Sequence, residues 1–256
     1  MAEAKPSNMK KSKVRNQAGF TRTELAVVII VLVVLLAMAL PGLQRAHQKV
    51  ARISCLSRLE QLGIAYRTFA NNTGDRYHAF TSVTNGGWRE LLAGTNAGAF
   101  VWTNFVAMAD IVGQSTYVAA CPTDERKKAK SFGRADFNDN SHVSYFVGAD
   151  ANDTHPQSLL AGDRNLGPGT VPDPEYGYSP KNGQGNDVII KGPVCWSLKM
   201  HSAGNPLGSG NILLGDGSGQ QTDSRSLNTQ YRINATSPAK TDGTTNNQAG
   251  FRLIFP

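Results

Sequence analysis

An uncharged apolar run near the N-terminus constrains this chain more than any other feature. Residues 25 to 40 contain only Leu, Ala, Val, Ile and Met. As a helix this run would be about 24 Å long, and the longer stretch from Phe20 to Leu43 would reach about 36 Å. The hydrocarbon core of a bilayer is roughly 30 Å thick. The segment therefore lies in a membrane, belongs to a removed targeting signal, or packs against copies of itself.

The residues on the N-terminal side of this run are basic. One acid, Glu3, stands against five basic residues: Lys5, Lys10, Lys11, Lys13 and Arg15. Because positive charge is retained on the cytoplasmic side of a membrane, this asymmetry predicts a cytoplasmic N-terminus. One carboxylate, Glu24, stands at the start of the apolar run. A charge at the edge of a bilayer favours a partner of opposite sign.

This junction resembles the class III signal peptide of type IV pilins and type II secretion pseudopilins. The matching residues are Gly19, Phe20, Thr21, Glu24 and Leu25. The resemblance implies that a prepilin peptidase cleaves between Gly19 and Phe20 and that Phe20 becomes N-methylated. Pro41 stands where the family often carries a helix-kinking proline. The chain departs from the pattern at Arg22 and Thr23, where the family is usually apolar.

The resemblance also implies a function. The expected protein is a structural subunit of a type II secretion pseudopilus or a related type IV pilus-like filament, and not an enzyme. Before assembly it would reside in the inner membrane as a single-pass protein. It would then assemble with copies of itself or related subunits. Its other partners would be the peptidase and the assembly platform. In the filament, Glu24 would pair with the amine of Phe20 on a neighbouring subunit.

The same residues also allow other interpretations. Thr21 and Glu24 also have the spacing of a capping box, in which each side chain satisfies a backbone N–H of the other residue. Ala37-Met38-Ala39 has the small-x-small pattern of an ordinary secretory cleavage site. Arg22 favours a membrane-anchored binding or adhesion protein of the envelope that does not polymerise. An envelope enzyme has only His201 and Asp216 in its favour.

The apolar run continues into an amphipathic helix. Apolar residues recur every three or four positions: Leu43, Ala46, Val50, Ile53, Leu56, Leu59, Leu62, Tyr66 and Phe69. The turn-forming sequence of residues 71–75 predicts the end of the helix. The expected organisation is a leader at 1–19, a transmembrane or filament-core helix at 20–43, its amphipathic continuation at 44–72, and a periplasmic or extracellular domain at 73–256.

The downstream domain is rich in turn-forming residues. Short helices are predicted at 88–92 and 105–113, and strands at 117–121, 143–147, 188–190, 211–214 and 251–255. Long loops are predicted at 149–187 and 234–250. The expected fold is α+β and pilin-like, with a long N-terminal helix packed on a small antiparallel sheet.

A branch of pseudopilin-like proteins extends the resemblance. This branch carries a segment like Cys121-Pro122-Thr123-Asp124, and later a His followed by a strand that ends in Asp-Gly. The matching residues here are His201, Asp216 and Gly217, with a longer gap than the family has. We expect Asp216-Gly217 to form a hairpin turn, with His201 hydrogen-bonded near it.

The three cysteines, Cys55, Cys121 and Cys195, have spacings that match no zinc-binding pattern. In an oxidising compartment one disulfide is expected. We predict a bond between Cys55 and Cys121, which would join the helix to the domain, with Cys195 as the competing partner.

No metal or cofactor is expected, although some pseudopilins bind calcium in a C-terminal loop. Oxygen ligands for calcium would come from Asp150, Asp153, Asp163, Asp173 and Asp187, but no EF-hand spacing is present. The net charge is +7, of which the leader carries +4, so the mature chain is only +3. The basic run at 126–130 is short and without aromatics, so nucleic-acid binding is not expected.

Overall fold

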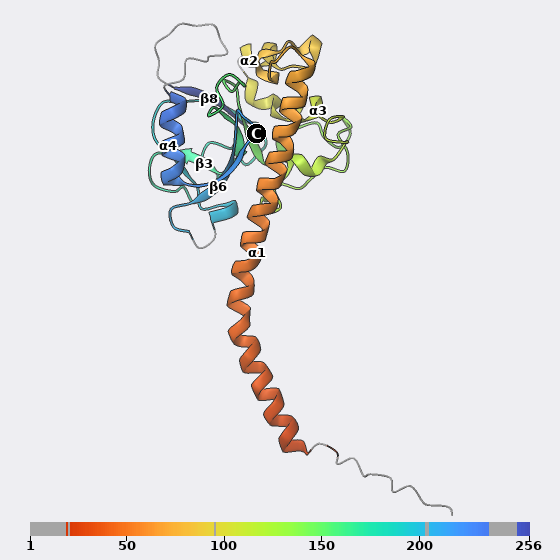
Figure 1. Ribbon diagram of the computed structural model, residues 1–256, viewed down its shortest axis with the longest axis vertical. Coiled ribbons are helices and arrows are strands. Elements are labelled where there is room, and N and C mark those ends of the chain that lie inside the picture. The colour runs from red at the N-terminus through yellow and green to blue at the C-terminus, as the bar shows by residue number, and fades with distance from the viewer. Residues whose placement is uncertain (1–18, 20, 95, 203–204, 236–249) are drawn as a thin grey trace, which may run out of the picture. The chain divides into compact units, whose positions relative to one another are not determined.

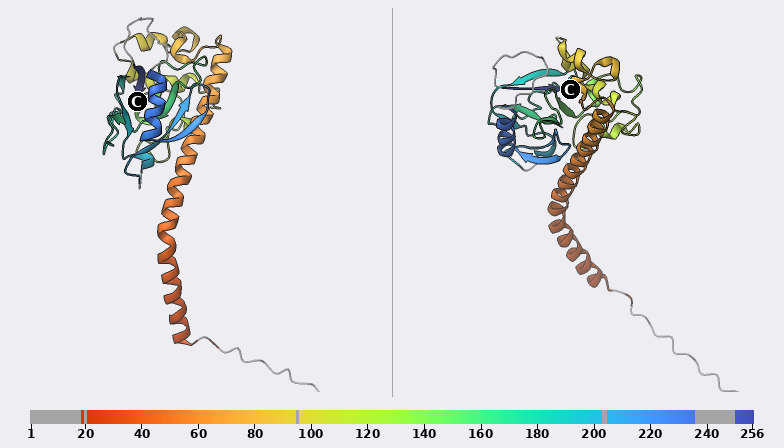
Figure 2. Two further views of the ribbon diagram at one scale, coloured as in Figure 1. Left: turned by 60° about the vertical axis from the view of Figure 1, so that its left-hand side comes forward. Right: turned by 45° about the horizontal axis from the view of Figure 1, so that its top comes forward.

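The computed structural model describes residues 19, 21–94, 96–202, 205–235 and 250–256 of the 256-residue chain (Figure 1 and Figure 2). The chain divides into two compact units, Met1–Ala46 and His47–Pro256, which we describe separately. One helix, α1 (Arg22–Asn72), begins in the first unit and ends in the second.

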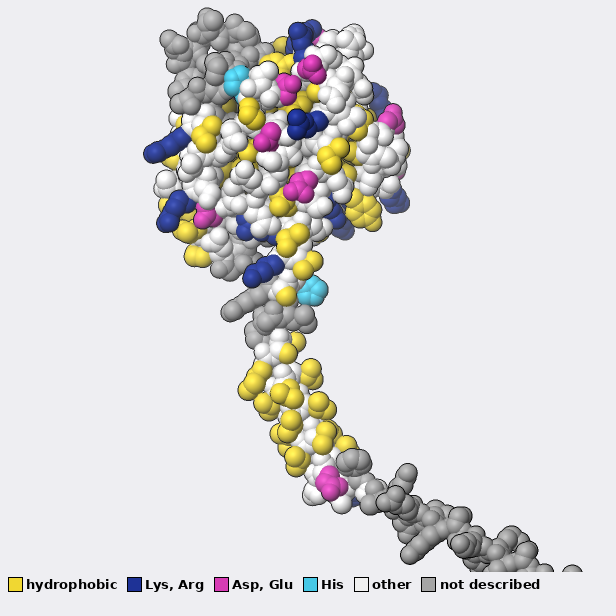
Figure 3. Space-filling view, in the orientation of Figure 1, with side chains coloured by type: hydrophobic (Ala, Val, Ile, Leu, Met, Phe, Trp, Pro, Cys, Tyr) yellow, Lys and Arg dark blue, Asp and Glu magenta, His cyan; other side chains and the backbone are white. Residues whose placement is uncertain are grey.

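In the first unit, the described residues of α1 present an apolar surface that is not buried. The window Arg22–Leu40 has a mean hydropathy of 2.9 and none of it is buried, so it is long and apolar enough to cross a membrane. Figure 3 shows apolar side chains covering this stretch of α1 on the visible face. Position 41 is helical, but the side chain of Pro41 lies outside the described residues, so a kink there stays a prediction.

In the second unit, α1 buries one face against the domain. Cys55, Leu59, Leu62, Tyr66 and Phe69 are buried, and the helix ends at Asn72, where residues 73–75 turn away. The amphipathic continuation and its end are therefore confirmed.

Three residues of the predicted apolar stripe, Ala46, Val50 and Ile53, are exposed and not part of the buried face. Val50 and Ile53 are 63% and 58% exposed. The prediction was wrong here because Ile53 and Leu62 are about two and a half turns apart and must lie on opposite sides of the helix.

The centre of the second unit is a six-stranded antiparallel sheet with strand order β4-β8-β1-β2-β6-β7. Its strands are β1 (Tyr145–Gly148), β2 (Leu159–Asp163), β4 (Asn186–Ile190), β6 (Ser209–Leu214), β7 (Gly219–Asp223) and β8 (Phe251–Phe255). A separate two-stranded antiparallel sheet is formed by β3 (Leu166–Pro168) and β5 (Val194–Trp196). The mixed helix and antiparallel sheet confirm the α+β class.

Both faces of the sheet are covered. Because alternate side chains of a strand point to opposite faces, Tyr145 and Val147 join the core that contains the buried residues of α1, whereas Phe146 joins a second core. This second core includes Leu227 of helix α4 (Ser224–Ala235) and Trp196 of β5. Figure 1 shows α4 and the second part of α1 on opposite sides of the sheet.

Several local predictions are confirmed. Helix α2 (Arg89–Ala93) lies at the first predicted helix, and the strands expected near 143–147, 188–190, 211–214 and 251–255 are β1, β4, β6 and β8. Helix α3 (Val101–Ala107) begins earlier than the helix expected at 105–113. The remaining short helices are of the 3-10 type: His78–Phe80, Val83–Asn85, Ala97–Phe100, Thr116–Ala119, Asn140–His142 and Met200–Ser202.

Other local predictions were wrong. The strand expected at 117–121 is largely the 3-10 helix Thr116–Ala119. The loop expected at 149–187 contains β2 and β3, while β5, β7 and α4 were not predicted. Most of the loop expected at 234–250 lies outside the described residues.

Candidate functional site

Four side chains that can bind a metal converge between α1 and the sheet. They are Cys55, Cys121, Asp163 and His201, and one ligand atom of each lies within 4.8 Å of those of the other three. In the part of the chain that the structure describes, this is the one such group of three or more Cys, His, Asp or Glu side chains. We call it the Cys-Asp-His cluster.

Regular secondary structure positions two members of the cluster. Cys55 lies on the buried face of α1, one turn before Leu59. Asp163 is the last residue of β2 and pairs with Tyr145 of β1. Like Ala161 two residues earlier, Asp163 points to the face of the sheet that α1 covers.

Backbone hydrogen bonds hold the segment that carries Cys121. The guanidinium of Arg58, three residues after Cys55 on α1, donates to the carbonyl of Ala120. The N–H of Ser144, just before β1, donates to the carbonyl of Ala119 at 2.9 Å. The segment is therefore fixed to both the helix and the sheet.

His201 lies in the 3-10 helix Met200–Ser202, which side chains hold in place. The hydroxyl of Ser209 donates to the carbonyl of His201 at 2.7 Å, and the hydroxyl of Ser202 donates to the carbonyl of Ser197 at 2.5 Å. The buried amide of Asn165 donates to the carbonyl of Lys199 at 3.0 Å. These bonds direct the imidazole toward Asp163.

The four ligand atoms are close to one another. Cys55 Sγ lies 3.2 Å from Asp163 Oδ1, and Cys121 Sγ lies 3.3 Å from His201 Nε2. His201 Nε2 lies 3.4 Å from Asp163 Oδ2, and both of these side chains are fully buried. The cluster is thus closed to solvent at its histidine and aspartate.

A second layer of polar groups orients the cluster. Thr123 Oγ1 lies 3.1 Å from Cys121 Sγ and 3.3 Å from His201 Nδ1. The hydroxyl of Tyr145 lies 3.2 Å from Cys55 Sγ. The backbone N–H of Asn211 donates to Asp163 Oδ2 at 2.6 Å. Each cluster member therefore has at least one polar neighbour outside the cluster.

Burial and mutual contact shift the ionisation of all four groups. Burial raises the pKa of Asp163 to about 7 and raises the pKa of Cys55. Burial also opposes ionisation of Cys121, but hydrogen bonds from Cys55 and His201 outweigh it and lower the Cys121 pKa to about 5. Burial disfavours the His201 cation, yet the charge of Asp163 prevails and raises the His201 pKa.

A buried ion pair beside the cluster fixes two of the segments that carry its residues. Asp124 and Arg164 form two hydrogen bonds of 2.8 Å, and their side chains are 0% and 2% exposed. Arg164 also stacks on Tyr176, with its guanidinium carbon 3.4 Å from the ring centroid. Because Arg164 follows Asp163 directly, this pair ties the segment of Cys121 and Asp124 to the end of β2.

The predicted cysteine partners are neighbours, but the predicted disulfide is absent. Cys55 and Cys121 share the cluster, and all three cysteines are free thiols. The sulfur atoms of Cys55 and Cys121 also contact Asp163 and His201, respectively. Cys195, the competing partner, lies in β5, outside the cluster.

The predicted turn at Asp216-Gly217 is confirmed, but His201 is not near it. Gly217 has a positive φ of 81° and closes the turn between β6 and β7 through a bond to Leu214. The Asp216 carboxylate accepts the N–H of Ser218 at 2.8 Å. The ring of His201 contacts the Cys-Asp-His cluster instead, so the prediction of its surroundings was wrong.

Four of the five acids considered as calcium ligands have other contacts. Asp187 forms an ion pair with Arg252, and Asp150 accepts the backbone N–H of Arg252 at 2.7 Å. Asp173 accepts the N–H of Glu175 at 2.7 Å. Asp163 belongs to the Cys-Asp-His cluster. Together with Asp153, these acids form no calcium-type group within the described ranges.

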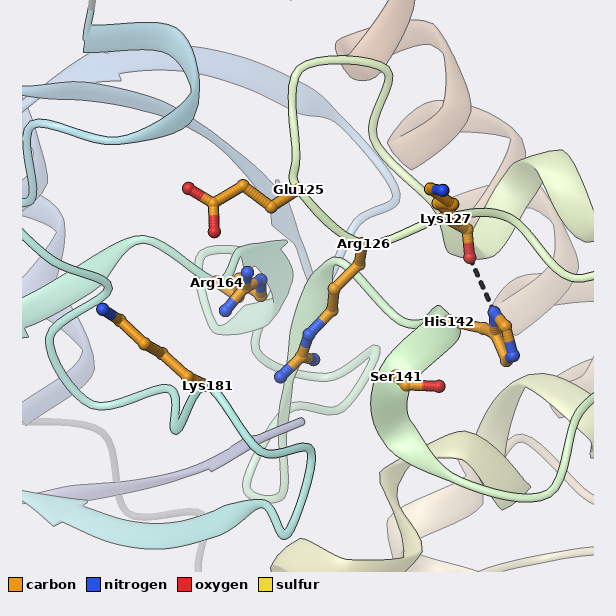
Figure 4. Close-up of a pocket in the computed structure, with 7 residues that line it drawn as sticks. All are labelled: Glu125, Arg126, Lys127, Ser141, His142, Arg164 and Lys181. Atoms are coloured by element: carbon orange, nitrogen blue, oxygen red, sulfur yellow. Dashed lines mark hydrogen bonds between the residues drawn. The ribbon is translucent and has the colours of Figure 1, made fainter.

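A separate basic pocket of about 360 Å³ is a weaker candidate (Figure 4). The Arg126 side chain at its centre donates to the carbonyls of Asn140, Val143, Pro180 and Pro256. Arg164 pairs with Asp124, and His142 Nδ1 lies 2.7 Å from the carbonyl of Lys127. The guanidinium groups in the pocket are already used to hold the fold together.

The N-terminal candidates lie in the other unit. The N–H of Thr21 donates to Glu24 Oε2 at 2.8 Å, and the N–H of Glu24 donates to Thr21 Oγ1 at 3.3 Å. This is the reciprocal capping box that the spacing allows. Gly19 is exposed, and Phe20 lies outside the described residues. Cleavage, methylation and pairing between subunits stay predictions.

Comparisons with family models, with curated proteins and with solved structures gave no significant match to this chain. The function must therefore be argued from the residues and their geometry. Two features carry chemical information: the exposed apolar part of α1 with its N-terminal junction, and the buried Cys-Asp-His cluster.

Proposed function

We propose that this protein is a structural subunit of a type II secretion pseudopilus or a related type IV pilus-like filament. One observation carries the proposal: the 19-residue window Arg22–Leu40 of α1 is apolar and wholly unburied, and it begins three residues after Gly19. Such a surface needs a bilayer before assembly and a protein environment after it.

The same helix serves in both environments. A basic leader keeps the N-terminus cytoplasmic while the helix spans the inner membrane. Cleavage between Gly19 and Phe20 then frees the subunit for assembly. Side chains such as Leu25, Ile30 and Leu36 are 55%, 63% and 63% exposed in the monomer. Each apolar side chain that becomes fully buried against neighbouring helices would contribute about 1.5 to 3 kcal/mol.

The capping box is compatible with pairing between subunits. Thr21 would be the second residue of the mature chain, so its hydrogen bonds with Glu24 survive cleavage. The capping bond from the Thr21 N–H uses Oε2 of the Glu24 carboxylate. Glu24 can therefore cap its own helix and accept the Phe20 amine of a neighbour through Oε1.

Exposed apolar residues in the second unit extend the surface available for assembly. Val50, Ile53 and Ile64 on α1 are 63%, 58% and 65% exposed. Ile53 and Ile64 are about three turns apart and therefore lie on the same side of the helix. This side faces away from the domain core and is suited to contact a neighbouring subunit.

Two substitutions separate prepilin processing from ordinary secretion. Gly19→Val should leave the precursor uncut, because the prepilin peptidase requires a small residue before the cleaved bond. Ala39→Phe should not change processing, although it would block a signal peptidase that cuts after Ala39. The mass of the membrane-associated protein distinguishes the two results.

The opposite pattern would contradict the proposal. If Ala39→Phe accumulates precursor while Gly19→Val is processed normally, the apolar run is a removed secretory signal. If neither variant changes the mass because the wild type itself is never cut, the chain is a permanently anchored envelope protein.

A further inference from the structure

We propose that the Cys-Asp-His cluster is a structural zinc site with Cys55, Cys121, Asp163 and His201 as its four ligands. The site would join α1 to the end of β2 and to the two segments that carry Cys121 and His201. This inference does not depend on whether the protein forms filaments.

Three of the six distances between ligand atoms are close to those of a tetrahedral site, and all six are at most 4.8 Å. Zinc lies about 2.3 Å from sulfur and about 2.0 to 2.1 Å from nitrogen or oxygen, which places neighbouring ligand atoms about 3.3 to 3.8 Å apart. The three separations given above, from Cys55 to Asp163, from Asp163 to His201 and from His201 to Cys121, are 3.2, 3.4 and 3.3 Å. Small shifts of the side chains would bring all four atoms onto one ion.

The donor types select the metal. Thiolate and imidazole ligands suit zinc, whereas calcium and magnesium prefer sites made of oxygen atoms. Four protein ligands complete a tetrahedron, and a buried site with no open position is typical of structural rather than catalytic zinc. The fully buried Asp163 and His201 side chains agree with this type.

The groups around the cluster match the outer shell of a metal site. A histidine that binds zinc through one nitrogen usually donates its other N–H to a neighbouring oxygen. His201 directs Nε2 into the cluster, and its Nδ1 lies 3.3 Å from Thr123 Oγ1. The N–H of Asn211 likewise holds the Asp163 carboxylate. Zinc ligands held in this way need little rearrangement to bind the ion.

The charges of the ligands and of Arg52 also favour a divalent cation in the cluster. Two thiolates and one carboxylate around a divalent cation leave one negative charge. Arg52, one turn before Cys55 on α1, supplies a half-buried positive charge that attracts both Asp163 and Cys55. Its guanidinium is held by bonds of 3.1 and 3.0 Å to the carbonyls of Gly210 and Thr222.

Metal content of the full-length protein, purified in detergent without an affinity tag, tests the site. We expect one zinc ion per chain in the wild type, measured by mass spectrometry of the metal. Cys55→Ser and His201→Gln should lower the zinc content about tenfold or more, since they remove ligands. Cys195→Ser is the matched control, because Cys195 is a buried free thiol outside the cluster, and it should keep its zinc.

Cobalt binding gives a second measurement, which for the wild type does not require any variant to fold. Co²⁺ exchanged into the wild type should show the absorption of a tetrahedral ion with thiolate ligands, and Thr123→Ala should weaken binding without removing a ligand. The proposal fails if the wild type contains no zinc and peptide mapping finds Cys55 bonded to Cys121. It also fails if the cobalt spectrum shows only oxygen ligands, or if both ligand variants keep full zinc.

Discussion

Glu24→Gln should yield a protein that is cleaved and inserted normally but does not assemble into filaments. Gln can replace Glu in a capping box, so the helix start should be preserved. The substitution removes the negative charge that would face the Phe20 amine of a neighbour in an apolar setting. Leaving a buried charge without its partner is strongly destabilising, so filament yield should fall on the order of tenfold or more. Filaments sheared from cells that express the variant alone provide the measurement.

Thr21→Ala is the matched control for this experiment. It removes the hydroxyl that accepts the N–H of Glu24 but leaves the carboxylate and its charge in place. Filament yield from Thr21→Ala should stay close to that of the wild type. Normal yield from Glu24→Gln would eliminate the pairing mechanism and leave Glu24 with the capping role alone.

Asp124→Asn should lower the free energy of unfolding by about 3 to 5 kcal/mol, because it leaves the buried Arg164 without its counter-charge. Both side chains of this pair are almost completely buried. Urea unfolding of the full-length protein in detergent measures the loss. The matched control is Lys181→Met, which removes the exposed ion pair with Glu175 and should cost about 0 to 1 kcal/mol. Equal losses of stability from the two substitutions would contradict the claim that the buried ion pair stabilises the fold more than the exposed one.

The same pair predicts a dependence of stability on pH. Burial alone would raise the pKa of Asp124, but hydrogen bonds and charge from Arg164 outweigh it and lower that pKa below its ordinary value. A carboxyl with a depressed pKa in the folded state stabilises the protein above its unfolded pKa of about 3.9. Its contribution should therefore be lost as the pH falls below about 4, and Asp124→Asn should remove this part of the acid sensitivity.

Much of the fold could be predicted from the sequence because its signals are local. The apolar run, the helical spacing up to Phe69 and the turn after Asn72 define α1 without reference to the rest of the chain. Strand β2 escaped prediction because its five buried residues end in Gly162-Asp163, which look like a turn when read alone. The segment 117–121 has the composition of a strand but no sheet neighbour, and it folds as a 3-10 helix.

The Cys-Asp-His cluster could not be predicted from spacing. Cys55 and Asp163 are 108 residues apart, and Cys121 and His201 are 80 residues apart. Zinc motifs that can be read from a sequence place ligands in close pairs, which this chain lacks. The sequence did predict that Cys55 lies near Cys121. It also marked the Cys121–Asp124 segment and His201 as parts of the family resemblance. It gave no reason to connect His201 with Asp163 rather than with Asp216.

The N-terminus of the mature protein tests the central claim most directly. We expect N-terminal peptide analysis of the membrane or filament fraction to find a chain that begins at Phe20 and carries one methyl group on its amine. A chain that begins at Leu40, or one that retains the basic leader, would contradict the account of this protein as a processed filament subunit.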